Sequence, residues 1–205
     1  MSRVAAQPEV VELRDGSRAL IRTIRPEDKR ALVEGLEHLS DDSRYKRFMT
    51  LKERLTSSEL RYLTEVDHHD HEALIAADPD TRAPLGVARY VRSTEDPDVA
   101  EAAVAIVDHW QGRGLGRALL DRLAGRARAE GVSRFSATVL GENRKMIRLL
   151  EGAGPVEFVG SGSGVLEVEL ELPPEMGPGR PLARTLRAAA AGEVELEPKA
   201  QTAVD

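Results

Sequence analysis

Residues 108–116 read Asp108-His109-Trp110-Gln111-Gly112-Arg113-Gly114-Leu115-Gly116 and connect the apolar segment 102–107 to a helical pattern over residues 113–130. The glycines of this stretch allow the backbone to approach a ligand closely. The first N–H groups of a helix have no partner within the helix, and the helix dipole adds positive charge at the same end. The stretch therefore predicts a loop that binds an anion such as phosphate.

Two well-known phosphate motifs do not fit this loop. The dinucleotide fingerprint requires a small residue three positions after its second glycine, but the chain has Arg117 or Leu119 there, depending on which glycine is taken as the first. A Walker loop ends in Gly-Lys followed by Ser or Thr, which this loop lacks. What remains is Gln-x-x-Gly-x-Gly, from Gln111 to Gly116. The alternative is a tight strand-to-helix turn with solvent-facing arginines.

Outward from this loop, short apolar segments alternate with helical patterns, which is typical of an α/β sheet. We expect strands over residues 10–13, 19–22, 73–77, 85–91, 102–107, 135–140, 156–159 and 165–172. We expect helices beginning near Pro26, Ser40 and Thr56, and over residues 113–130 and 143–153. Thr56 and Glu59 have the spacing of a capping box, which marks a helix N-terminus.

Composition indicates a globular protein with one folded unit. The chain has 205 residues, of which 41% are hydrophobic and 31% charged, and it has no cysteine. We assign residues 1–9 to an N-terminal leader, 10–172 to the folded domain, and 173–205 to a Pro/Ala/Glu-rich tail that is mobile or docked, with one candidate helix over residues 182–191.

The same features predict where the protein works and what it does not bind. No apolar run reaches the roughly 20 residues of a membrane span, and the N-terminus lacks the apolar block of a signal peptide. The net charge of −6 argues against a broad nucleic-acid surface. The sequence therefore predicts a cytoplasmic protein that engages neither membrane nor nucleic acid.

Residues 101–154 resemble the acyl-CoA-binding core of the GNAT acetyltransferases. The resemblance rests on the central apolar strand, the loop from Gln111 to Gly116, the long helix after it, and residues 136–140 and 142–146. Residues 24–28 and 39–48 look like the bacterial Pat-type protein-lysine acetyltransferase branch. One departure is Gly154-Pro155, where family members usually have Gly-Phe. Because proline cannot donate to a strand ladder, the start of the following strand is in doubt.

The resemblance implies a GNAT-like fold and an acyl-CoA site. The fold would be a splayed, mostly antiparallel mixed sheet of about seven strands with helices on both faces. Pantetheine would pair with the backbone near Ile106 and Val107, with Asn143 beside it. The pyrophosphate would bind the amides of residues 111–117, which are Gln111, Gly112, Arg113, Gly114, Leu115, Gly116 and Arg117. Acetyl-CoA would be the co-substrate, with no metal.

The implied reaction is direct attack of a neutral amine on an acyl thioester, which requires a group to accept a proton. Pat-type members carry a glutamate at the start of the central strand, and this implies Glu101 as the base. On local evidence alone Glu101 reads as a solvated acid. His109 is the rival because of its ordinary pKa, although it belongs to the phosphate loop. We expect no metal at His68-His69-Asp70-His71, because adjacent side chains on an extended chain point apart.

The sequence thus predicts an N-acyltransferase that moves an acetyl or short acyl group to a primary amine. The acceptor is a small-molecule amine or a protein lysine; residues 95–101 carry an acidic run that would suit a cationic acceptor. A non-catalytic acyl-CoA-binding regulatory module and an unrelated nucleotide-binding protein are the competing interpretations. The protein would be a monomer or a homodimer.

Overall fold

One mixed sheet runs through the molecule, and the computed structural model describes residues 7–162 and 164–172. Its strand order is β1-β2-β3-β4-β5-β6-β8-β7. The strands are β1 (Glu9–Glu12), β2 (Arg18–Thr23), β3 (His71–Ala77), β4 (Pro84–Arg92), β5 (Val99–Ile106), β6 (Arg134–Leu140), β7 (Val156–Gly162) and β8 (Val165–Glu171). All neighbours are antiparallel except β5 and β6. The predicted mixed α/β fold is confirmed, with eight strands where about seven were expected.

The predicted helices are present as well. They are the 3-10 turn η1 (Pro26–Asp28) with α1 (Lys29–Glu37), then α2 (Asp41–Phe48), α3 (Ser57–Thr64), α4 (Leu115–Ala129) and α5 (Arg144–Ala153). A further 3-10 turn, η2 (Asp108–Trp110), was not predicted. The predicted capping box begins α3: Thr56 Oγ1 accepts from the Glu59 N–H, and Glu59 Oε2 accepts from the Thr56 N–H. The tail predicted for residues 173–205, including its candidate helix, lies outside the described residues.

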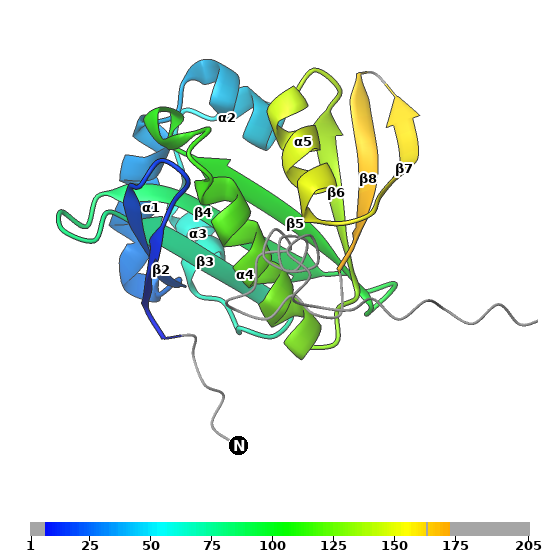
Figure 1. The fold of residues 1–205 in the computed structure, drawn as a ribbon, viewed down its shortest axis with the longest axis horizontal. Helices are drawn as coiled ribbons and strands as arrows, with labels where there is room; N and C mark the ends of the chain where they lie inside the picture. Colours follow the sequence, from blue (N-terminus) through cyan, green and yellow to red (C-terminus); the bar gives the residue numbers. More distant parts are fainter. Residues whose placement is uncertain (1–6, 163, 173–205) are drawn as a thin grey trace, which may run out of the picture.

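Helices cover both faces of the sheet (Figure 1). Leu115, Leu119, Leu123 and Ala127 of α4 are each at most 1% exposed and belong to the larger core cluster, together with residues of α5. On the opposite face, Leu32 of α1 packs with leucines before and within α3. The four-residue spacing of the apolar side chains in α4 thus placed its buried face correctly.

The sheet splits between β5 and β6. These two parallel strands pair only at Val99–Arg134, Ala100–Phe135 and Glu101–Ser136. Beyond Glu101, β5 stays paired with β4 as far as Ile106, whereas β6 continues with β8. The two strands therefore diverge toward the N-terminal end of α4 (Figure 1).

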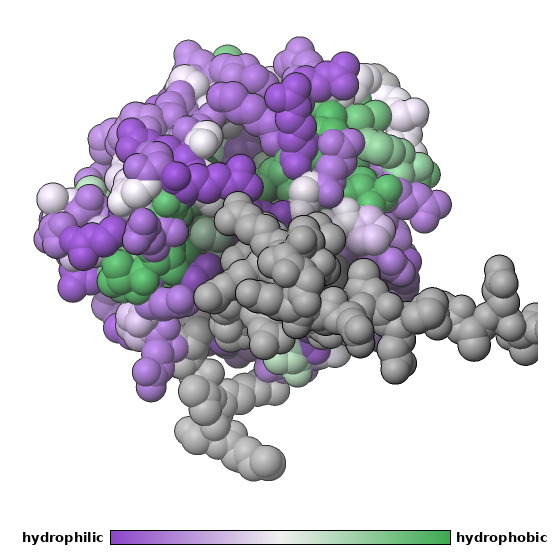
Figure 2. All heavy atoms as spheres, viewed as in Figure 1, coloured by the Kyte–Doolittle hydropathy of each residue, from purple (hydrophilic) through white to green (hydrophobic). Residues whose placement is uncertain are grey.

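The strand whose start was in doubt because of Pro155 is present as β7. β7 begins at Val156, directly after the proline, and the Pro155 carbonyl accepts from the Glu171 N–H at 3.0 Å. Proline is tolerated because β7 is the outer strand of the sheet, where one row of backbone groups needs no partner. Phe158 and Val159 of β7 are about half exposed, at 52% and 51%, and Figure 2 shows apolar surface over β7 and β8.

Gly86 of β4 fills a tight position beside the split. It pairs with Ile106 of β5, and a Cβ atom at Gly86 would lie 2.6 Å from Ile106 Cδ1 and 2.8 Å from the Ala105 carbonyl oxygen. The Ile106 side chain could turn away, but the Ala105 carbonyl could be relieved only by movement of β5. Glycine at this position lets the two strands pair next to the end of the split.

A buried glutamate anchors α4 to the sheet. Glu72 of β3 is 0% exposed; its Oε1 accepts from His68 Nδ1 and from the Ala73 N–H, both at 2.8 Å, and its Oε2 accepts from Arg126 Nε of α4. A buried charge costs several kcal/mol unless it is paired. Arg126 is the permanently charged partner in this group.

We expect Arg126→Met to lower the free energy of unfolding by about 3–5 kcal/mol, because it leaves the Glu72 carboxylate buried without its cation. In a domain of this size the melting temperature would fall by roughly 10 °C. Arg122→Met on the same helix is the control, since Arg122 pairs with the half-exposed Glu9 at 2.9 Å. A surface pair contributes about 0–1 kcal/mol. Equal losses in urea titrations of the two variants would contradict the anchoring role of Glu72.

A second ion pair joins β2 to η1. Arg22 donates to both carboxylate oxygens of Asp28, at 2.7 and 2.6 Å, and Asp28 is 7% exposed. Burial by itself would raise the pKa of Asp28, but the hydrogen bonds from Arg22 and from the Arg25 N–H outweigh it and hold the pKa below its usual value.

This pair predicts a loss of stability in acid. Because the pKa of Asp28 is lower in the folded than in the unfolded chain, its contribution is complete above the unfolded value of about 4 and is lost as pH falls below it. Asp28→Asn should therefore destabilise the protein at pH 7, and by less at pH 3, where protonation has already removed part of the contribution of the charge. Urea unfolding of both proteins at the two pH values measures this. A difference independent of pH would assign the effect to packing instead of charge.

Candidate functional site

The loop after β5 has the backbone conformation that its glycines suggested. The chain leaves β5 through η2 and enters α4 with Gly112 at φ +79° and Gly114 at φ +98°. These left-handed values favour glycine strongly. Gly114 is the residue that precedes the first turn of α4.

The backbone N–H groups of residues 112–117 lie before and in the first turn of α4. None of them donates a hydrogen bond to another residue in the described part of the chain, whereas the next group, the Ala118 N–H, donates to the Gly114 carbonyl at 3.0 Å. Unpaired helix amides together with the helix dipole bind phosphate oxygens well. The loop therefore has the chemistry that a pyrophosphate requires.

Gln111 braces this loop from the side. Its Nε2 lies 3.2 Å from the Ile106 carbonyl, Ser43 Oγ of α2 and Asp108 Oδ1, and its Oε1 accepts from Lys145 Nζ of α5 at 3.0 Å. The side chain thus joins the end of β5 to two helices. Its role in the structure is to fix the loop, and Lys145 brings a cation to the same place.

The two arginines of the loop are engaged with protein groups. Arg113 stacks on Trp110, with 4.9 Å from its guanidinium carbon to the ring centroid, and its Nε donates to the His109 carbonyl. Arg117 donates to Asp121 and to the Gly152 carbonyl of α5. Trp110 also packs against the larger core cluster, and the backbone amides offer the better phosphate contacts.

The backbone of β5 faces the split at alternate residues. We expected pantetheine to pair near Ile106 and Val107, but Val107 does not face the split. The Val107 N–H donates to the Leu85 carbonyl and its carbonyl accepts from the Trp110 N–H, so Val107 points toward β4. Backbone groups alternate in direction along a strand, and therefore those of Ala102, Val104 and Ile106 point into the split. The Ile106 carbonyl is already bound by Gln111 Nε2. Because Glu101 still pairs with Ser136, the Ala102 N–H is used by β6, so Val104 and the Ala102 carbonyl are the freest groups for a strand-like ligand.

Glu101 is the last residue of β5 before the split opens, and its side chain is exposed. From Glu101 to Ile106 the strand covers five residue steps, roughly 17 Å at about 3.3 Å per residue. His109 is also exposed, but it lies in η2 beyond the far end of β5. The two candidate bases therefore stand at opposite ends of the split.

Asn143 caps the helix on the other side of the split. Its Oδ1 accepts from the Met146 N–H at 3.2 Å, and its side-chain NH2 makes no hydrogen bond within the described residues. This amide is a free donor beside the split.

The histidine cluster at residues 68–71 is directed to three different partners. His68 binds Glu72, His69 Nδ1 lies 2.5 Å from Glu130, and His71 Nε2 lies 3.0 Å from Arg89. Within residues 7–162 and 164–172, no group of three potential ligands could hold a metal ion.

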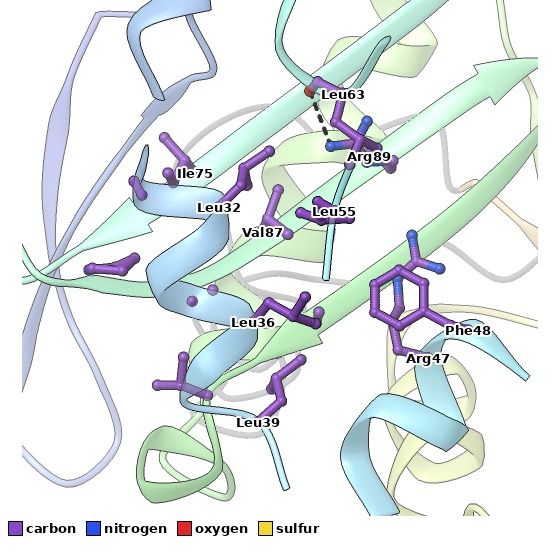
Figure 3. Close-up of a pocket in the computed structure, with 16 residues that line it drawn as sticks. Leu32, Leu36, Leu39, Arg47, Phe48, Leu55, Leu63, Ile75, Val87 and Arg89 are labelled. Carbon is purple, nitrogen blue, oxygen red and sulfur yellow. Dashed lines mark hydrogen bonds between the residues drawn. The ribbon is translucent and has the colours of Figure 1, made fainter. Parts of the chain in front are cut away.

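Two guanidinium groups that the sequence did not single out lie beside the split. Arg47 of α2 and Arg89 of β4 line a pocket with Ala105 of β5 (Figure 3). The one signal in the sequence was an arginine in the middle of an apolar strand, at Arg89. α2 reads as a polar surface helix and gives no such signal for Arg47.

The profile of the acetyltransferase (GNAT) family matches residues 33–154 of the chain, a range that includes the split, the glycine loop and the α5 cap. The chain belongs to the GNAT acetyltransferase family. The GNAT core therefore coincides with the site described above, and the recognition made from the sequence is confirmed.

Known GNAT proteins support the assignment. The chain is 32% identical over 167 residues to acetyltransferase Pat of Mycolicibacterium smegmatis, covering 82% of this chain and 50% of that protein. It thus spans half the length of this relative. The crystal structure of the GNAT domain of S. lividans PAT has 35% identity and a TM-score of 0.76, covering 83% of this chain and all of that one.

A more distant GNAT fold is yncA from Salmonella typhimurium, a putative acetyltransferase solved with its cofactor acetyl-CoA. It has 24% identity and a TM-score of 0.61, covering 78% of this chain and 98% of that one. At this identity the likeness shows the fold alone.

Proposed function

We propose that this protein transfers an acetyl group from acetyl-CoA to a primary amine, with Glu101 as the general base. The observation that carries the proposal is the combination of the split beside β5 with unpaired amides at the start of α4. The amides of residues 112–117 would bind the pyrophosphate, and the Ala102 carbonyl and the backbone of Val104 would pair with the pantetheine arm. The side-chain NH2 of Asn143 would donate to the same arm.

In this reaction the neutral amine nitrogen attacks the thioester carbonyl. A carbon–nitrogen bond forms, the carbon–sulfur bond breaks, and the products are the N-acetyl amine and CoA. Glu101 would accept a proton from the amine, directly or through one water, and the CoA thiolate is protonated on release. A backbone N–H of β5 in the split would stabilise the developing oxyanion.

The experiment is a panel of amines with acetyl-CoA, in which CoA release is followed with a thiol reagent. The panel contains amino acids, simple alkylamines, a polyamine and a lysine-containing peptide. Turnover that depends on an amine supports the proposal. Acetyl-CoA binding without turnover on any amine would favour the non-catalytic acyl-CoA-binding module, and competition of CoA by ATP or NAD would favour a nucleotide-binding protein.

A protein lysine is the second candidate acceptor, because the chain resembles Pat-type acetyltransferases in sequence. The acidic run before β5 supports it less than the sequence suggested. Asp96 pairs with Arg134 at 2.8 Å, so part of the negative charge is neutralised within the protein.

The cytoplasm is the proposed compartment, since a chain without cysteine suits reducing conditions. Among the described residues, no helix has the length and apolar character needed to cross a bilayer. A monomer and a homodimer are both compatible with the proposed reaction.

A further inference from the structure

An apolar pocket lies on the face of the sheet to which Glu101 belongs. Leu32, Leu36 and Leu39 near and on α1 form one side of it, and Val87 and Ala105 of the sheet form another (Figure 3). Side chains alternate between the faces of a strand, so Ala105, Ala103 and Glu101 of β5 share this face. Glu101 does not line the pocket, but Arg89, which does, pairs with Ala103, two residues from Glu101 on the same face.

Arg89 brings a positive charge into this pocket, and no carboxylate of the described residues pairs with it. The residue is 6% exposed, and its side chain bonds the Leu63 carbonyl at 3.1 Å and His71 Nε2 at 3.0 Å. Burial, followed by the charge of Arg89, lowers the pKa of His71 to about 4, so this imidazole is neutral at pH 7. Both partners of Arg89 are therefore uncharged.

Arg47 is the second cation of the pocket, and its guanidinium has even fewer partners. No hydrogen bond or ion pair within the described residues involves it; its guanidinium carbon stands 5.0 Å from the Phe48 ring centroid. Burial lowers the pKa of Arg47, and the negative charge of Glu101 raises it in part. Burial, together with the charge of Arg47, lowers the pKa of Arg89 to about 10. Arg47 is thus close enough to influence both Arg89 and Glu101.

Two neighbouring cations in an apolar pocket are unfavourable unless an anion binds between them. A guanidinium presents its N–H groups in a planar fork that matches a carboxylate, and such charged hydrogen bonds are the strong ones. The ammonium group of a lysine side chain would be repelled by the same pair. The apolar remainder of the pocket fits an aliphatic group.

We propose that the acceptor is an α-amino acid with an aliphatic side chain: its carboxylate binds Arg47 and Arg89, its side chain lies among the leucines, and its amino group faces the start of the split near Glu101. This inference rests on the proposed acetyl transfer and names its substrate class. The product would be an N-acetyl amino acid, formed by the bond changes given above.

The test compares L-leucine with 3-methylbutylamine, which is leucine without its carboxylate. We expect kcat/KM with acetyl-CoA to be at least about 100-fold higher for L-leucine, since two charged hydrogen-bonding groups recognise the carboxylate. Arg47→Gln should lower kcat/KM for L-leucine about 10- to 100-fold, mainly through KM, and should lower it much less for 3-methylbutylamine, so that the preference for L-leucine shrinks. Arg47 makes no hydrogen bond or ion pair to the described residues that the fold would lose, so this variant should stay folded.

Lys46→Gln is the matched control. It removes a charge of the same sign from the same helix, but Lys46 pairs with Asp42 at 2.6 Å and is not part of the pocket lining. We expect it to change neither amine's kinetics. Equal loss of L-leucine acetylation in the two variants would mean that the general charge of α2 matters, and it would overturn the carboxylate site.

Other outcomes separate this inference from the acetyl transfer itself. Equal use of both amines, or preference for a lysine peptide, would overturn the amino-acid assignment while acetyl transfer stands. If the phosphonate analogue of leucine is the better substrate, the pocket recognises a dianion instead of a carboxylate, and the amino-acid assignment is overturned as well. If no amine is acetylated, calorimetric titration of the CoA-bound protein with L-leucine decides: binding that Arg47→Gln weakens supports the site, and absence of binding overturns it.

Discussion

Replacing Glu101 with glutamine is expected to lower kcat by about 10²–10⁴-fold at pH 7, the usual range for loss of a general base. Glutamine keeps the size of the side chain and removes its basicity. The affinity for CoA should hardly change, because Glu101 and the glycine loop stand at opposite ends of the split. Activity should recover in part at high pH, where more of the amine is already neutral. Steady-state kinetics from pH 6 to about 9.5 measure both effects.

His109→Gln is the control for the other candidate base. His109 is exposed beyond the far end of β5, so we expect its loss to alter KM for acetyl-CoA more than kcat. Near-native turnover in Glu101→Gln with loss in His109→Gln would reverse the two roles. If both variants remain active, water or the substrate itself handles the proton, and Glu101 is a solvated acid.

Replacing Gly114 with valine is expected to weaken CoA binding by at least about 100-fold. Gly114 has φ +98°, which valine rarely adopts, and a Cβ atom there would lie 3.2 Å from Arg14 Cγ. The Arg14 side chain can shift, but the strained φ is relieved only if the backbone moves, and with it the amides proposed to bind pyrophosphate. In the wild-type protein, CoA at about 1 mM should raise the melting temperature by mass action, and in the variant the rise should vanish.

Gly131→Val separates strain from binding. Gly131 has φ +88° and lies just beyond the opposite end of α4, where a Cβ atom would have open space around it among the described residues. Both variants should lose about 1–2 kcal/mol of stability from the forced backbone conformation. Only Gly114→Val should lose the response to CoA. A normal CoA response in Gly114→Val would remove the loop from the binding site, while no response in the wild type would count against acetyl-CoA altogether.

The fold could be predicted from the sequence because local patterns and distant pairing agree. The glycine positions of the loop require left-handed backbone that other residues disfavour, and the apolar spacing of α4 fixes its buried face. Thr56 and Glu59 marked the start of α3 for a similar local reason. Such features depend on a few neighbouring residues, so no knowledge of the tertiary structure was needed.

The site was less predictable where it depends on packing. The register of β5 against β4 decides whether the backbone groups of Val107 or of Val104 face the split. The sequence alone does not predict this register. Gln111 belongs to the recognised motif, but its contacts with Ser43 and Lys145 come from two separate helices. Sequence reasoning therefore predicted the conformation of the glycine loop and missed what holds it in place.

The same limit explains why the two guanidiniums of the pocket were not anticipated. Arg47 and Arg89 are far apart in the chain, and only the packing of α2 on the sheet brings both to one pocket. Arg89 lies in a strand of mostly apolar residues, where a single charge gives no hint of its partners.

Gly86 has a consequence for how variation in this protein should be interpreted. A methyl group at this position would collide with Ile106 and with the Ala105 carbonyl, and β5 would have to shift at the end that leads into the glycine loop. Selection against substitution would therefore be strong at a residue that takes no part in the chemistry. If related proteins keep glycine at this position, the reason is steric, because β4 and β5 leave no room for a side chain. Mutational scanning would then find Gly86 as intolerant of substitution as a catalytic residue.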